Sequence, residues 1–127
     1  MPHPNVEVDE ANQRIYLTME GSPTVEESAA ISDACIEAAK RLSDGFDLVN
    51  DMRTFQPTDE AALEEVERGK RGLAENGMAA AVRVTSESAT GQMQWDRAGE
   101  DAEGYQVAKA GSIEDAEKLL DKRRQEA

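Results

Sequence analysis

Several polar side chains follow the apolar stretches of this chain closely enough to share one site. Their types are a carboxylate, two guanidinium groups and four hydroxyls, and the set comprises Asp51, Arg53, Thr54, Thr58, Arg83, Thr85 and Ser86, preceded by Glu20 and Ser22. In a parallel sheet, the carboxyl ends of the strands and the N-termini of the following helices meet at one edge. We therefore predict that this set lines a strand-end rim, where arginine, hydroxyls and helix N-termini suit a small anionic ligand.

A purely structural interpretation of the same residues stays open. Asp51 would then pair with an arginine, and the hydroxyls would cap helices. Other chemistry has little support, because the only histidine is His3 and the only cysteine is Cys35. Zinc spacing, a nucleophile with its base and a lysine-bearing phosphate loop are all missing from the sequence. We expect no catalytic residue, no metal and no cofactor.

The elements that must position the rim follow from the apolar periodicity. Short alternating stretches indicate strands, and stretches with a spacing of three to four residues indicate helices. The expected strands are 6–9, 14–20, 46–53, 78–84 and 105–108, and the expected helices are 24–42, 58–76, 86–98 and 112–124. This order, β-β-α-β-α-β-α-β-α, predicts an α/β fold with a mixed, mostly parallel sheet and an N-terminal antiparallel hairpin. We expect one domain over 5–124, with flexible termini at 1–4 and 125–127.

Individual residues add further expectations. Thr24 and Thr58 are placed to cap the first two helices. Gly69 and Gly72 lie inside the second helix, where they indicate either close packing or fraying. Cys35 is expected to be a packed thiol, with a reactive thiol as the alternative. Met78 and Met93 are expected in the core.

The net charge of −13, from 27 acidic and 14 basic side chains, constrains the partners. It disfavours nucleic acid and anionic membrane surfaces. Acidic residues are spread over the predicted helices, and arginine outnumbers lysine, which indicates adaptation to high salt; an ordinary acidic protein is the alternative. The sequence shows no leader or membrane-spanning stretch, and the lone Cys35 fits a reducing compartment, so we expect a cytoplasmic protein.

The segment Phe46-Asp47-Leu48-Val49-Asn50-Asp51-Met52-Arg53, together with the element order, resembles the STAS family of sulphate-transporter and anti-sigma-factor-antagonist domains, and most closely its stand-alone SpoIIAA-like branch. The resemblance implies a four-helix layer against a mixed sheet with strands in chain order, and a non-enzymatic role in binding or signalling. Antagonists of this family carry a phosphorylatable serine after the strand that corresponds to this segment. Here the equivalent stretch is Gln56-Pro57-Thr58-Asp59, so Thr58 is the candidate for phosphorylation.

The leading hypothesis is a non-catalytic, STAS-like binding or regulatory module that takes a protein partner or a small anionic ligand. The alternatives are a small-molecule binding protein or enzyme with its site at the strand-end rim, and a structural or oligomerising role. We expect a monomer or a weak dimer.

Overall fold

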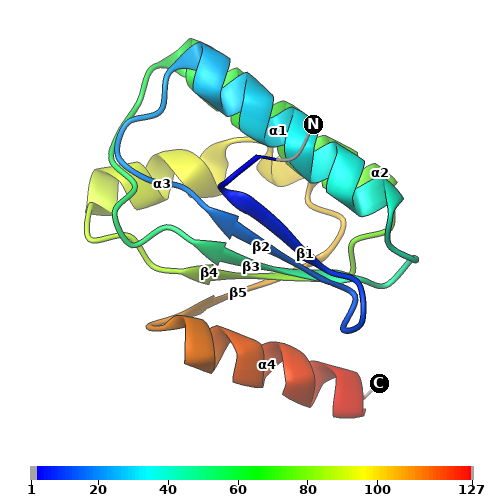
Figure 1. Ribbon diagram of the computed structural model, residues 1–127. Helices are drawn as coiled ribbons and strands as arrows, with labels where there is room; N and C mark the ends of the chain where they lie inside the picture. The colour runs from blue at the N-terminus through cyan, green and yellow to red at the C-terminus, as the bar shows by residue number, and fades with distance from the viewer. Residues whose placement is uncertain (1–2, 127) are drawn as a thin grey trace.

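Five strands form one sheet in the order β1-β2-β3-β4-β5 in the computed structural model, which describes residues 3–126 (Figure 1). The elements are β1 (Val6–Asp9), β2 (Arg14–Thr18), α1 (Val25–Lys40), β3 (Asp47–Asp51), α2 (Glu60–Glu75), β4 (Ala80–Val84), α3 (Ala89–Arg97), the 3-10 turn η1 (Glu100–Ala102), β5 (Gln106–Ala110) and α4 (Ile113–Glu126). The predicted α/β class and element order are confirmed.

The sheet is mixed in the way that the sequence predicts. β1 and β2 form an antiparallel hairpin, in which Val6 lies opposite Leu17. The pairs β2–β3, β3–β4 and β4–β5 are parallel, and Val49 of the central strand lies opposite Tyr16 and Val82. The strands therefore follow chain order, and β3 is buried between two parallel neighbours.

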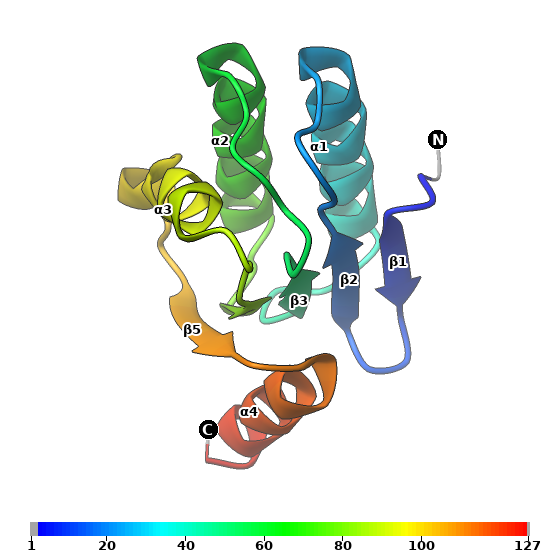
Figure 2. The ribbon, with the colours of Figure 1, turned by 90° about the vertical axis from the view of Figure 1, so that its left-hand side faces the viewer.

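The helices cover both faces of the sheet. α1, α2 and α3 lie on one face, and α4 lies alone on the other (Figure 2). The single four-helix layer that the family resemblance implied is therefore wrong. The reason is that β3 is apolar on both sides: Leu48 packs into the cluster under α1–α3, whereas Val49 packs with Leu120 of α4. A strand that is apolar on both sides needs a helix on each face.

The two glycines of α2 mark close packing rather than fraying. A Cβ atom at Gly69 would lie 2.7 Å from Ser32 Oγ, and one at Gly72 would lie 2.5 Å from Ile36 Cγ1. Both obstructing residues belong to α1. The glycines therefore let α1 and α2 approach each other closely. Figure 2 shows the two helices side by side on one face of the sheet.

Helix capping follows the prediction at one helix and departs from it at the next. Thr24 and Glu27 form the expected capping box of α1, with N–H to oxygen distances of 3.0 and 3.1 Å. The N-cap of α2 is Asp59, which accepts from the Ala62 N–H, so the prediction of Thr58 is wrong. Thr58 instead donates its hydroxyl proton to the Pro23 carbonyl.

Two other details differ from the sequence expectation. Met78 is buried as predicted, but the side chain of Met93 is 50% exposed on α3, so its predicted core position is wrong. α4 continues to Glu126, two residues past the predicted domain end at 124. Met1, Pro2 and Ala127, which were expected in flexible termini, lie outside the described residues. Within 3–126, every helix is too short or too polar to cross a membrane.

Candidate functional site

At the carboxyl end of β3, two charged residues of the predicted rim, Asp51 and Arg53, are paired with each other. Arg53 donates from Nε to Asp51 Oδ1 at 3.0 Å and from Nη2 to Asp51 Oδ2 at 2.9 Å. These bonds lower the pKa of Asp51 and keep its carboxylate ionised. Arg53 is more than half exposed, with a side-chain exposure of 53%. The pairing is the one that the structural interpretation of the sequence proposed.

The hydroxyls of the rim connect loops to one another. Thr58 Oγ1 donates to the Pro23 carbonyl, Ser86 Oγ to the Phe55 carbonyl and Ser22 Oγ to the Pro57 carbonyl, each at 2.7 Å. Thr54 and Thr85 are exposed. The Thr54 carbonyl accepts from the Gly21 N–H, and the Thr85 N–H donates to the Ala110 carbonyl at the end of β5. The structure thus brings Asp51, Arg53, Thr54, Thr58 and Ser86 together around the loops that leave β3 and β4. Ligand binding there, and phosphorylation of Thr58, stay predictions.

Arg83 does not reach the rim. Its side chain is 5% exposed and lies on the face of β4 that α3 covers. It donates to Asp96 Oδ1 and to Glu103 Oε1, both at 2.8 Å. Arg83 is therefore neutralised inside the fold and holds α3 and the loop after it onto the sheet.

A second cation shares this buried network. Lys70 of α2 donates from Nζ to the Trp95 carbonyl at 2.6 Å and to Glu103 Oε1 at 2.9 Å. The pKa of Lys70 is lowered to about 8, mainly because the side chain is buried and secondly because Arg83 repels its charge. Burial also raises the pKa of Tyr105 beside the same groups. Lys109 completes the network with an ion pair to Asp96 at 2.6 Å.

Sequence reasoning missed this network. One signal was available, because Lys70 lies four residues after Val66 and three before Leu73, on the inner stripe of α2. A charged residue at a core position of a helix must find a partner, which indicates a buried ion pair. The partners gave no such signal: Glu103 lies in an acidic stretch that resembles the rest of the surface, and Asp96 is a single acid beside Arg97.

One small cavity lies in the described interior, and it is too small for a substrate. The cavity between α1, α2 and the sheet has a volume of about 30 Å³, and Ser28, Cys35 and Trp95 are among the residues that line it. Such a space holds about one water molecule. Cys35 is fully buried there, and burial raises the pKa of its thiol to about 12, so it is a packed rather than a reactive thiol. Within the described part of the chain, His, Cys, Asp and Glu side chains form no group of three suited to a metal ion.

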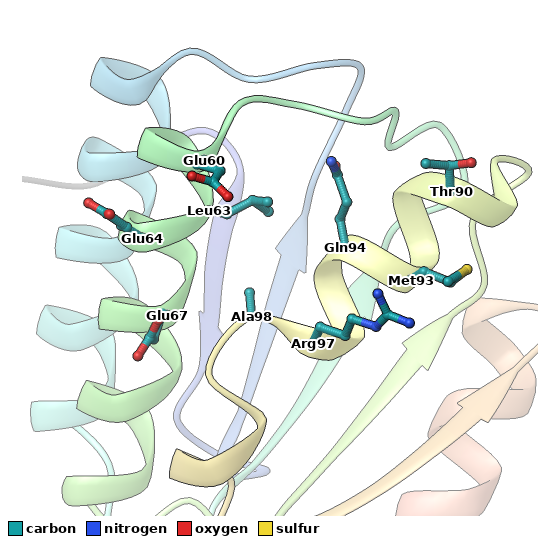
Figure 3. Close-up of a pocket in the computed structure, with 9 residues that line it drawn as sticks. All are labelled: Glu60, Leu63, Glu64, Glu67, Thr90, Met93, Gln94, Arg97 and Ala98. Carbon is teal, nitrogen blue, oxygen red and sulfur yellow. The ribbon is translucent and has the colours of Figure 1, made fainter.

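An open concave surface lies between α2 and α3. Figure 3 shows this groove, which has a volume of about 530 Å³. Leu63 of α2 points across it towards α3, and Met93 and Ala98 add apolar surface from the other side. The polar lining residues are Glu60, Glu64 and Glu67 on α2 and Thr90, Gln94 and Arg97 on α3. We call this surface the α2–α3 groove.

Each wall of the groove is held in place by its own contacts. Gln94 accepts from the Thr58 N–H at 2.9 Å and donates to the Thr58 carbonyl at 3.2 Å, which joins α3 to the loop before α2. Trp95, the next residue, packs edge-on against Phe55 with ring centroids 5.5 Å apart. Glu67 is paired with Arg71 at 2.7 Å. Glu60 and Glu64 are both exposed, and neither takes part in an ion pair among the described residues. Their carboxylates therefore face solvent at the groove.

Comparison with known proteins does not place the chain in a family. No protein-family model matches it, and no curated protein has significant sequence similarity to it.

Proposed function

We propose that this chain is a non-catalytic binding module of STAS-like type, and that its binding surface is the α2–α3 groove. The observation that carries the proposal is the combination of an exposed apolar side chain, Met93, with an open groove of about 530 Å³ beside it. An exposed apolar surface with a polar border is typical of a protein interaction site. A groove between two helices accommodates the apolar face of a partner helix.

The charges of the groove favour a basic partner. Glu60 and Glu64 follow each other by one helical turn on α2 and border the apolar surface of Leu63. A segment with apolar residues on one face and lysine or arginine beside them would match both features. Small anions are disfavoured here because the carboxylates repel them. The apolar contacts would supply most of the affinity in molar salt, where charge attraction is screened.

The test uses a labelled amphipathic peptide with leucine on one face and lysine on the other, titrated by fluorescence anisotropy. We expect it to bind, and Glu64→Lys to weaken binding by about tenfold, which corresponds to about 1.4 kcal/mol. Met93→Ala should also weaken binding, through lost apolar contact. The matched control is Glu75→Lys, which makes the same charge change at an exposed position of α2 outside the groove.

The control separates specific binding from attraction to an acidic protein. If Glu75→Lys weakens binding as much as Glu64→Lys, the peptide follows the net charge and the groove proposal is wrong. A parallel titration with sulfate examines the strand-end rim. Saturable sulfate binding that Arg53→Ala abolishes would favour the small-anion function at the rim instead.

A further inference from the structure

The β5 edge of the sheet is open to further pairing. Four of its five residues are exposed, Gln106 to Lys109. The N–H of Gln106 donates to Ala79 and the carbonyl of Ala110 accepts from Thr85, so these residues direct their backbone groups towards β4. Along a strand the direction alternates, and the N–H and C=O groups of Val107 and Lys109 therefore point outward. Within residues 3–126, no further strand pairs with this side of β5.

Apolar side chains border this edge on both faces of the sheet. Val107 is 38% exposed and Leu119 of α4 is 42% exposed, and with Met93 they are the exposed large apolar residues of the described chain. A hollow of about 380 Å³ lies beside them, lined in part by Val82, Ala108 and Leu120. Two of the three exposed large apolar residues thus border one strand edge, whereas the third lies in the α2–α3 groove.

Charge separates this edge from the rest of the surface. Residues 105–127 carry five acidic and five basic side chains, so the 22 acidic and nine basic side chains of residues 1–104 account for the whole net charge of −13. The opposite edge strand, β1, contains Glu7 and Asp9, and like charges oppose the pairing of two such edges. A second copy of this acidic chain would be repelled at most of the surface but not at β5 and α4.

We propose that the β5 edge pairs with the β5 edge of a second copy of this chain, in an antiparallel arrangement that joins the two sheets. A twofold axis requires a surface that is complementary to itself, and an edge strand with outward backbone groups meets this requirement. This inference does not depend on the proposed binding function.

The sequence of β5 favours one register. If the axis passes between the two copies of Ala108, the outward-facing backbone groups of Val107 meet those of Lys109 in the second copy. Small alanine side chains then lie at the close central pair, and the two lysines avoid facing each other. Lys109 keeps its ion pair with Asp96, and the two Leu119 side chains lie on the same face of the joined sheet.

The test is the molecular mass by sedimentation in molar KCl, where repulsion between acidic copies is screened. We expect the wild-type mass to rise with concentration from 13.8 kDa to twice that value. Val107→Glu and Leu119→Glu should each raise the dissociation constant at least about tenfold. Met93→Glu makes the same exchange at the remaining exposed large apolar residue and should leave association unchanged. Circular dichroism verifies that each variant is folded.

Amide hydrogen exchange locates the interface independently of substitution. The N–H groups of Val107 and Lys109 should exchange more slowly as the protein associates, because pairing buries them. Three results would overturn the proposal: a wild-type mass of one chain at about 1 mM, equal weakening by Met93→Glu, or association that leaves these two amides unprotected.

Discussion

At the scale of single residues, burial separates two aspartates of the same strand that look equivalent in the sequence. Asp51 is partly exposed and pairs with the exposed Arg53. Asp47 is fully buried and accepts from Arg14 at 2.7 Å and from Arg124 at 3.0 Å. Exposed ion pairs contribute little to stability, whereas removal of one partner from a buried pair costs about 3–5 kcal/mol. Asp51 with Arg53 therefore contributes little to the stability of the fold, whereas Asp47 contributes to it by attaching α4 to the sheet.

The buried Lys70 gives a pH-dependent stability. Below pH 8 it is charged in both states, and burial of that charge opposes folding. As the pH rises, the folded protein releases this proton while the unfolded chain keeps it up to about its ordinary pKa of 10.5. The unfolded state then binds more protons, so the free energy of unfolding should rise by about 1 kcal/mol between pH 7 and pH 9.

The measurement is urea denaturation of the wild type, Lys70→Met and Lys40→Met across that range. Lys70→Met should lack the rise, and Lys40→Met, which changes an exposed lysine, should keep it. The range stops at pH 9 because Cys35 acts increasingly in the opposite direction near that value: its thiol, with an ordinary pKa of 9.0, ionises in the unfolded chain but stays neutral when buried. An identical pH response in the two variants would contradict the role given to Lys70.

At the scale of elements, the contact of α1 with α2 depends on Gly69. Alanine there would gain about 1 kcal/mol of helix propensity. It would also place a methyl group 2.7 Å from Ser32 Oγ, whose hydroxyl donates to the Glu65 carbonyl. Because overpacking of this kind costs about 1–3 kcal/mol, we expect Gly69→Ala to lower the free energy of unfolding by about 1 kcal/mol net.

Two further variants make this prediction specific. Ser32→Ala should recover part of the loss in the Gly69→Ala background, which a double-mutant cycle in urea measures. Gly72→Ala should cost less, because it meets Ile36, whose half-buried side chain can change rotamer. Stabilisation by Gly69→Ala would show that the helices have room to separate.

The same scale explains how much could be predicted from the sequence. The spacing of apolar residues predicted the strands and helices, because apolar side chains such as Val49 must be buried and their spacing therefore follows the repeat of the element that carries them. It did not determine the α2–α3 groove, since Leu63 and Met93 line one groove only through the way α3 lies against α2. Thr58 was mistaken for a cap because the sequence does not show that the Pro23 carbonyl lies within reach of its hydroxyl. Local sequence patterns therefore predict the elements and the position of the strand-end rim. The α2–α3 groove and the Thr58 contact depend on how the elements pack against each other, which local patterns do not show.

At the scale of the whole molecule, the fold divides into an acidic part and a neutral part. The hairpin, α1, β3 and α2 each carry an excess of acidic residues, whereas β5 and α4 together carry equal numbers of both signs. α4 is also the single helix on its face of the sheet (Figure 2). Repulsion therefore acts mainly among the hairpin, α1, β3 and α2, and screening of that repulsion should strengthen the packing of α1 against α2 first.

This distribution predicts a stability that depends on salt. A net charge of −13 on 127 residues destabilises the compact state at low ionic strength, where the Debye length is about 30 Å, close to the size of the domain. In molar KCl the length falls to about 3 Å, and the repulsion becomes small. We expect the thermal midpoint to rise strongly between dilute buffer and molar KCl, with most of the rise below about 0.15 M if simple screening is the cause. A rise that continues through the molar range would instead indicate specific ion binding or stronger apolar burial, and a flat response would contradict the high-salt adaptation that the composition indicates.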